Sequence, residues 1–381
     1  MIVHVFGRTD VGRTREHNED AFVVADLSTG NATLQPEVRT HTLGPRGTLF
    51  MVADGMGGAA AGEIASAMAI EVVLKELTDA FRHAAPDDDG FASALKRAAS
   101  ADNAKIHGYA LEHPEFRGMG TTATIAGVFG DGVYLAQVGD SRAYLVRDGV
   151  ARQITKDQSL MQKLIEAGEL TEEEAELSER RNIILQALGP ESVIKVDLTR
   201  QQVRTGDTLI LCSDGLSGQV KIGEIADAVR EEAELMAVCK RLIDRANENG
   251  GPDNITVIAV RFEGDALSDP ANGDAVGHRV FPLPTDTGPT PAQARPTVPA
   301  NMEITATTPI PTPADRRPSL NPTAKDFLRA SIAPEMAAMA RRRTRGSLIA
   351  LGLLVVLLAG ATWWVYSKAS ALKPVPATAT P

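Results

Sequence analysis

The composition of the chain changes abruptly after Phe262, and this change limits where a folded domain can lie. Of the 22 prolines, 13 fall between Gly264 and Arg345, in a stretch otherwise rich in Thr, Ala and Asp. Such a stretch buries too little apolar surface to offset the entropy lost on ordering. We therefore predict a disordered linker over residues 264–345, preceded by one large domain over residues 1–263.

An uncharged segment of 21 residues, 346–366, follows the predicted linker. As an α-helix it would be about 31 Å long, close to the roughly 30 Å hydrocarbon core of a bilayer. Four arginines precede it, and Trp363, Trp364 and Tyr366 lie at its other end. This arrangement is typical of a membrane helix whose basic end lies in the cytoplasm. We expect a single-pass protein of the inner (plasma) membrane, contacting lipid through residues 346–366, with residues 1–345 cytoplasmic and a short tail, 367–381, outside.

Charge and cysteine content exclude several classes of function. Lys and Arg number 39 against 49 Asp and Glu, a net charge of −10 that argues against a nucleic-acid partner. The two cysteines, Cys212 and Cys239, provide neither a disulfide framework nor a zinc-binding spacing. Cys212 has no arginine six positions later, and although Cys239 has Arg245 there, both lie within the predicted helix Glu234–Glu248 rather than in a phosphate-binding loop, so a cysteine-dependent phosphatase is not expected. The first ten residues also lack the basic start and apolar core of a signal peptide.

Apolar and polar residues alternate within residues 1–263 in a way that predicts both strands and helices. The expected strands are Thr48–Ala53, Thr121–Phe129, Val133–Val138, Ala143–Val146, Thr208–Cys212 and Ile255–Phe262. The expected helices are Gly62–Phe81, Phe91–Leu111 and Glu234–Glu248. Several strands follow one another at hairpin spacing, which indicates an α+β fold in which helices cover antiparallel sheets.

Four aspartates stand at the ends of these predicted strands: Asp54, Asp140, Asp214 and Asp253. An aspartate before a glycine is most often a turn former. If the sheets bring the four together, however, they cannot all stay ionised without cations, and all-oxygen ligation suits Mg²⁺ or Mn²⁺. Arg15 lies near the acidic pair Glu19 and Asp20, where a guanidinium could bind phosphate.

Seven short motifs occur in an order that resembles the PP2C (PPM) family of metal-dependent protein Ser/Thr phosphatases, in its bacterial form. They are Arg15-x-x-Asn18-Glu19-Asp20, Asp54-Gly55-Met56-Gly57-Gly58, Gly118-Met119-Gly120-Thr121-Thr122, Val138-Gly139-Asp140-Ser141-Arg142, Thr155-x-Asp157-Gln158-Ser159, Ser213-Asp214-Gly215 and Asp253-Asn254-Ile255-Thr256. The resemblance covers residues 3–262 and implies an αββα sandwich of two antiparallel sheets flanked by helices.

The resemblance also implies the role of each matched residue. Asp54 would bridge two Mn²⁺ or Mg²⁺ ions, the Gly55 carbonyl would bind one of them, and Asp214 and Asp253 would complete the dinuclear centre. Glu19 and Asp20 would hold metal-bound waters, directly or through neighbouring groups, and Asp140 would help to bind a weaker third metal. Arg15 would bind the phosphate. The implied catalytic residues are thus Arg15, Asp20 and Asp54.

The implied reaction is hydrolysis of phosphoserine and phosphothreonine by a water that the two metals activate for in-line attack. One departure from some relatives concerns the general acid, because Met56 stands where they have a histidine. His17 and a water on the third metal are both open as replacements, and the general acid stays unassigned.

Residues 156–189 correspond by position to the family's mobile flap, which is where we expect substrate choice to be set. The partners implied are phosphorylated proteins, among them Ser/Thr kinases and their substrates. Two other functions stay open. One is a catalytically inactive scaffold that binds phosphoproteins at the membrane, and the other is a phosphatase of an anti-anti-sigma-type regulator.

Overall fold

The computed structural model describes residues 1–29, 40–178, 180–265, 267 and 275–283. The chain divides into two units, Met1–Ala294 and Arg295–Pro381, and the second lies outside the described residues. So do the predicted membrane helix 346–366, the tail 367–381 and most of the linker. Among the helices that the structure describes, none combines the length and the apolar composition needed to cross a membrane.

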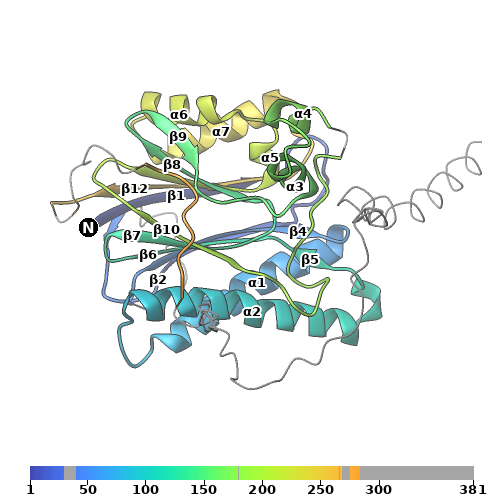
Figure 1. The fold of residues 1–381 in the computed structure, drawn as a ribbon, viewed down its shortest axis with the longest axis horizontal. Coiled ribbons are helices and arrows are strands. Elements are labelled where there is room, and N and C mark those ends of the chain that lie inside the picture. The colour runs from blue at the N-terminus through green and yellow to red at the C-terminus, as the bar shows by residue number, and fades with distance from the viewer. Residues whose placement is uncertain (30–39, 179, 266, 268–274, 284–381) are drawn as a thin grey trace, which may run out of the picture. The chain divides into compact units, whose positions relative to one another are not determined.

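Two antiparallel sheets form the centre of the described domain (Figure 1). The first has the order β3 (Thr40–Thr42), β1 (Ile2–Asp10), β12 (Ile255–Glu263), β11 (Thr208–Cys212), β8 (Arg142–Arg147), β9 (Val150–Gln153). The second has the order β10 (Asp197–Gln202), β7 (Gly132–Val138), β6 (Ala123–Phe129), β4 (Thr48–Met56), β2 (Asp20–Asp26). A short strand, β5 (Gly120–Thr121), pairs with β4 beside the second sheet.

Helices cover the outer face of each sheet. In Figure 1, α1 (Ala59–Ala80) and α2 (Asp88–Glu112) lie along the second sheet, while α6 (Ile222–Glu231) and α7 (Leu235–Glu248) lie along the first. Shorter helices connect the strands: α3 (Leu160–Glu166), α4 (Glu172–Glu176), α5 (Asp214–Ser217) and the 3₁₀ turn η1 (Pro114–Phe116). The expected αββα arrangement is therefore confirmed for the described domain.

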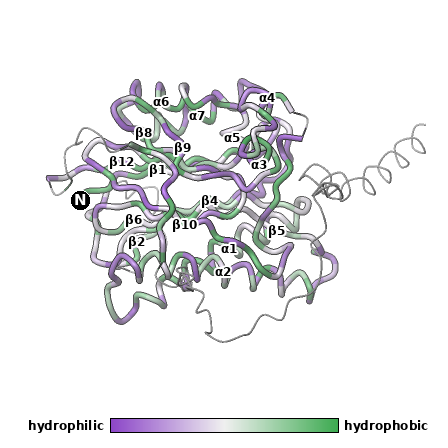
Figure 2. Tube along the Cα trace, viewed as in Figure 1, coloured by the Kyte–Doolittle hydropathy of each residue, from purple (hydrophilic) through white to green (hydrophobic). Residues whose placement is uncertain are grey.

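Three buried apolar clusters correspond to the three interfaces of this arrangement. One lies between the second sheet and helices α1 and α2, and includes Leu77, Phe91 and Ile125. A second lies between the first sheet and helices α6 and α7, and a third joins the two sheets. The central strands β4 and β6 are accordingly apolar along most of their length, whereas polar residues mark the outer helix faces (Figure 2). Both sheet faces are thus covered, which is why β6, β7 and β11 are almost entirely buried.

All six strands predicted from sequence are present, and β11 has the predicted bounds Thr208–Cys212. The predicted Thr121–Phe129 strand is interrupted at Thr122 into β5 and β6. Five strands were not predicted: β1, β2, β3, β9 and β10. Of these, β2 and β10 contain charged residues, which interrupt the apolar alternation by which a strand is recognised in a sequence.

The structure differs from the predicted domain boundary at residue 263. Residues 275–283, placed in the linker by composition, pack along the open edge of β10 as an extended segment that we call the strap. Val280 pairs antiparallel with Thr199, and the Phe281 N–H donates to the Leu198 carbonyl at 2.8 Å. Leu283 is 3% exposed within the apolar cluster under α1 and α2. A few apolar side chains with a free strand edge are sufficient to order a segment that composition places in a linker.

Candidate active site

Carboxylates from the two sheets meet at one end of the sandwich. Asp20 begins β2 and lies opposite Asp54 on β4 in the antiparallel register. Asp214 follows β11 and Asp253 precedes β12, the two central strands of the other sheet. The Asp20 carboxylate joins the sheets, because its Oδ2 accepts hydrogen bonds from the hydroxyls of Ser213 at 2.8 Å and Thr256 at 2.7 Å. The strand ends identified in the sequence therefore do lie together.

At this end of the sandwich, burial and mutual repulsion raise the pKa values of several carboxyl groups. Burial is the main cause that raises the pKa of Asp20 to about 7. The hydrogen bonds from Thr256 and Ser213 lower this pKa, and repulsion from Asp214 and Asp253 raises it. Burial, followed by repulsion from Asp20, Asp214, Asp140 and Asp253, raises the pKa of Asp54 well above its usual range. Burial and Asp253 likewise raise the pKa of Asp214. Each carboxylate makes it harder for its neighbours to ionise.

Two features of these side chains fit a hard divalent cation. Among the described residues, the buried Oδ1 atoms of Asp20 and Asp140 have no hydrogen-bond partner. Buried oxygens of this kind are costly unless a proton or a cation satisfies them. Within the same part of the chain, no three His, Cys, Asp or Glu side chains enclose a metal position as they stand. The carboxylates are neighbours that repel one another, and oxygen-preferring cations such as Mg²⁺ or Mn²⁺ are the partners that would neutralise them.

Gly55 lies where three backbone segments converge behind Asp54. Its N–H donates to the Glu19 carbonyl at 3.2 Å, and a Cβ atom at Gly55 would approach that carbonyl to 2.6 Å. The same Cβ would also collide with the Gly62 backbone in α1. The Glu19 side chain is 8% exposed, and the Ser66 hydroxyl of α1 donates to the Glu19 carbonyl at 2.6 Å. A glycine is required here because any side chain would separate α1 from the loop that carries Glu19.

Arg15 lies at the edge of the carboxylate group. Its Nη2 donates to Asp253 Oδ2 at 2.8 Å, with 46% of the Arg15 side chain exposed. Its loop is held by Asn254, whose Nδ2 donates to the carbonyls of Val11 and His17 and whose Oδ1 accepts from the Glu19 N–H. His17 itself is exposed to solvent.

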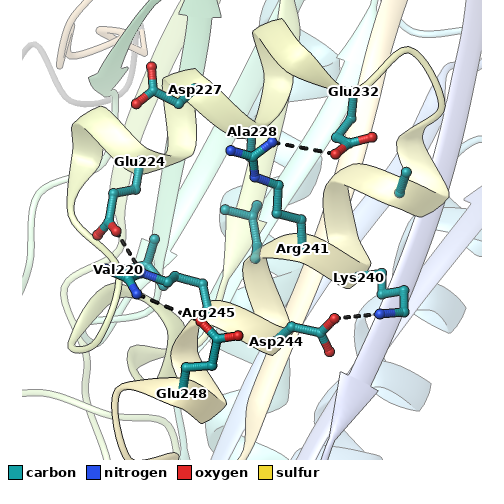
Figure 3. A pocket seen from close by; sticks show the side chains of 12 residues that line it. Val220, Glu224, Asp227, Ala228, Glu232, Lys240, Arg241, Asp244, Arg245 and Glu248 are labelled. Atoms are coloured by element: carbon teal, nitrogen blue, oxygen red, sulfur yellow. Dashed lines mark hydrogen bonds and ion pairs between the residues drawn. The ribbon is translucent and has the colours of Figure 1, made fainter.

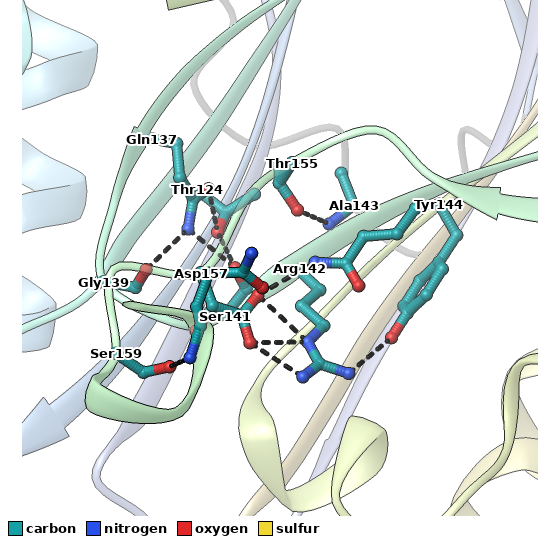
Figure 4. Close-up of polar contacts among 12 residues, drawn as sticks. Thr124, Gln137, Gly139, Ser141, Arg142, Ala143, Tyr144, Thr155, Asp157 and Ser159 are labelled. Carbon is teal, nitrogen blue, oxygen red and sulfur yellow. Dashed lines mark hydrogen bonds and ion pairs between the residues drawn. The ribbon is translucent and has the colours of Figure 1, made fainter. Parts of the chain in front are cut away.

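Asp140 lies in the turn between β7 and β8, next to the start of the flap segment. It is 7% exposed, and burial, followed by Asp214 and Asp157, raises its pKa to about 8. Figure 4 shows the contacts that hold this turn: the Arg142 guanidinium binds Asp157 through Nε and Nη2, the latter at 2.7 Å. The preceding Gly139 exchanges two hydrogen bonds with Gln158.

Sequence reasoning missed the residues that support the carboxylates. Ser213, Asn254 and Thr256 all lie within quoted motifs, but were not assigned a role. The same is true of Thr122, whose hydroxyl accepts from the Asp54 N–H at 3.0 Å. The one sequence feature that could have identified these residues is their position next to a predicted metal ligand. Only the strand register shows which of the carboxylates each hydroxyl faces.

A groove of about 560 Å³ elsewhere on the domain contains none of the predicted site residues. It lies between α6 and α7 and is crossed by ion pairs such as Arg245 with Glu224 at 2.7 Å (Figure 3). Its apolar floor includes Val220, Ala228 and Leu242, and its charged residues largely satisfy one another. Its polar groups are not arranged around a reactive centre, so we place the functional site at the carboxylates.

Comparisons with known proteins agree with this placement. Residues 34–258 match the family described as Protein phosphatase 2C. The chain is 38% identical over 260 residues to the Serine/threonine phosphatase stp of Listeria innocua, covering 68% of this chain and 95% of that one. It is 36% identical over 260 residues to the Serine/threonine protein phosphatase PstP of Mycobacterium tuberculosis, covering 68% of this chain but 45% of that one.

Solved structures show the same similarity in three dimensions. The catalytic domain of a serine/threonine protein phosphatase PstP in complex with two manganese ions superposes with a TM-score of 0.57 at 35% identity, covering 69% of this chain and 99% of that one. The Streptococcus agalactiae serine/threonine phosphatase superposes with a TM-score of 0.59 at 32% identity, covering 68% of this chain and 100% of that one.

Proposed function

The chain belongs to the protein phosphatase 2C family and is a metal-dependent protein Ser/Thr phosphatase, and from that premise we propose which of its residues act and how. The observation that supports the assignment best is the meeting of Asp20 and Asp54 of one sheet with Asp214 and Asp253 of the other. Burial and the neighbouring carboxylates raise the pKa of Asp20, Asp54 and Asp214.

We propose that Asp54, the Gly55 carbonyl, Asp214 and Asp253 hold two Mn²⁺ or Mg²⁺ ions. Glu19 and Asp20 then orient water next to them, and Asp140 contributes to a weaker third site. When bound, such ions supply charge neutralisation and an activated water for attack on phosphorus. The relative solved with two manganese ions supports a dinuclear centre.

The chain's own residues orient the reactants. Ser213 and Thr256 donate to Oδ2 of Asp20, and its other oxygen, Oδ1, is buried without a hydrogen-bond partner among the described residues. Arg15, half exposed at the edge of the carboxylates, is placed to bind phosphoryl oxygens through two N–H groups. A cysteine nucleophile is not available, because burial raises the pKa of both Cys212 and Cys239 to about 12.

The setting in the cell is also part of the proposal. The uncharged residues 346–366, with arginines before them, support a single membrane span that keeps the phosphatase domain in the cytoplasm. Tethering of this kind raises the effective concentration of the enzyme toward membrane-bound partners. Phosphorylated Ser/Thr kinases and their substrates are the partners we propose, with the flap segment, 156–189, selecting among them.

Release of phosphate from a phosphothreonine peptide tests the catalytic part of the proposal. We expect activity that depends on added Mn²⁺ or Mg²⁺ and is abolished by a chelator. Asp54→Asn and Asp214→Asn should each lower kcat/KM by at least about 100-fold, since each removes a charge at the reacting centre. Asp227→Asn on α6 is the matched control and should stay within about twofold of the parent.

Activity that survives both chelation and the two substitutions would refute the mechanism. Binding of the phosphopeptide without release of phosphate would instead identify an inactive phosphoprotein-binding scaffold. A preference for a phosphorylated anti-anti-sigma-type regulator over kinase-derived peptides would identify the third alternative.

A further inference from the structure

Gly189, at the C-terminal end of the flap segment, is held on both of its backbone polar groups by side chains of α2. Its N–H donates to Asn103 Oδ1 at 2.8 Å, and its carbonyl accepts from His107 Nδ1 at 2.7 Å. Its φ of +106° lies in the region that favours glycine, and a Cβ atom here would approach Ile106 Cγ2 to 2.6 Å. The chain therefore passes very close to the helix at this point.

The Asn103 side chain is committed entirely to this crossing. It is 2% exposed, and besides accepting from Gly189 it donates through Nδ2 to the carbonyls of Glu191 at 3.0 Å and Ser192 at 3.3 Å. A primary amide offers one acceptor and two donors, and all of them face the segment 189–192. The hydrogen bonds of the Asn103 side chain thus serve to bind this segment and not to stabilise its own helix.

The end of the flap segment is connected in turn to the backbone of Asp54. Leu188 and Thr121 exchange N–H to carbonyl hydrogen bonds at 2.9 and 3.1 Å. The Thr121 hydroxyl donates to the Asp54 carbonyl at 2.9 Å, and the Thr122 N–H donates to the same atom at 2.9 Å. A continuous set of hydrogen bonds therefore runs from α2 through the flap end and β5 to Asp54.

We infer that Asn103 and His107 form a clamp, made of positioning residues, that fixes the end of the flap relative to Asp54. The inference rests on the proposed function, because it assigns these residues to the placement of a protein substrate at the phosphatase site. While these hydrogen bonds are in place, the distance between the flap surface and the carboxylates is fixed. A phosphorylated protein that contacts both depends on that spacing, whereas a small phosphate ester contacts only the carboxylates.

Limited trypsin digestion of the full chain tests the clamp without reference to activity. Arg180 and Arg181 are exposed within the flap segment, so cleavage after them reports how freely it moves. We expect Asn103→Ala to speed this cleavage at least about fivefold and His107→Ala by about threefold, as expected for lost hydrogen bonds. Asn249→Ala removes a side-chain bond to the Gln219 carbonyl at the end of α7 and serves as the matched control. It should leave flap cleavage unchanged.

Kinetics with two substrates separate positioning from loss of structure. For both clamp variants we expect KM for a phosphothreonine protein to rise about fivefold, with kcat/KM for p-nitrophenyl phosphate within about twofold of the parent. A variant that merely unfolds would lose both activities together and would also be cut at the buried Arg147 and Arg204. Because His107 is only partly buried, its variant keeps the test valid if Asn103→Ala does not fold.

Flap cleavage and phosphoprotein KM that match the parent in both folded variants would overturn the clamp. A parent protein without phosphatase activity would refute the proposed function instead, while the cleavage comparison would still decide whether the clamp exists.

Discussion

At the scale of single residues, helix α2 contains a buried carboxyl group that the proposed mechanism does not use. Asp102 on α2 is fully buried, and among the described residues neither of its carboxylate oxygens has a hydrogen-bond partner. Burial raises its pKa from 3.8 to about 8. An acid that keeps its proton to a higher pH in the folded state than in the unfolded state makes the fold less stable as pH rises. Here that loss spans about pH 4 to pH 8.

Asp102→Asn removes this ionisable group while keeping the shape of the side chain. We expect the variant to be more stable than the parent at pH 8 by on the order of 2 kcal/mol, with a much smaller difference at pH 5. Urea unfolding at the two pH values measures this. Asp89→Asn, exposed in the first turn of the same helix, is the control and should show no pH-dependent gain. A gain in stability for Asp102→Asn that is equal at both pH values would contradict the raised pKa of Asp102.

Asp20 illustrates how much a residue depends on partners remote in sequence. Its two hydroxyl donors, Ser213 and Thr256, are 193 and 236 residues away and belong to the other sheet. Both motifs that contain these donors could be read from the sequence. Which oxygen each hydroxyl contacts follows only from the packing of one sheet on the other.

At the scale of elements, the strap is the feature that composition did not indicate. It adds to the edge of β10, and its Phe281 ring packs edge-on against Tyr134 with centroids 5.4 Å apart. His278 Nε2 also lies 2.6 Å from Asp197 Oδ2. The covered edge strand and the added apolar contacts make residues 275–283 part of the folded domain.

Substitution along the strap distinguishes packed from solvent-facing side chains. Phe281→Ala should lower the free energy of unfolding by about 2 kcal/mol, because it removes a ring from the apolar cluster under α1 and α2. Val280→Ala changes a neighbouring side chain that is 65% exposed, and should cost under about 0.5 kcal/mol. Thermal and urea denaturation provide the comparison. Equal effects of the two substitutions would mean that the strap is not packed in solution.

At the scale of the whole molecule, the sequence predicts a phosphatase domain joined to a membrane by a long tether. The arginine-rich stretch before residue 346 opposes the overall charge of −10 and sets the predicted orientation. We expect the full chain, expressed in bacteria, to sediment with membranes. A chain lacking residues 346–366 should be found in the soluble fraction with its phosphatase activity retained.

Orientation is checked separately by a tag placed after Pro381, which external protease should remove from intact spheroplasts. Retention of the full chain in the soluble fraction, or a tag that is protected, would contradict the proposed span or its direction.

The sequence by itself determined the features that depend on a few consecutive residues. The periodicity of α1, the bounds of β11 and the acidic strand ends could all be predicted, because turn chemistry and side-chain alternation are local properties. The order of the motifs also indicated the family.

Only the tertiary structure decided which of these residues meet. The pairing of Asp20 with Asp54, the crossing of Gly189 over α2 and the docking of Phe281 on β10 all join segments distant in the chain. Such contacts depend on sheet register and on helix packing. The alternation within a strand indicates which of its side chains face the core, but it does not indicate which distant strand or helix lies against them.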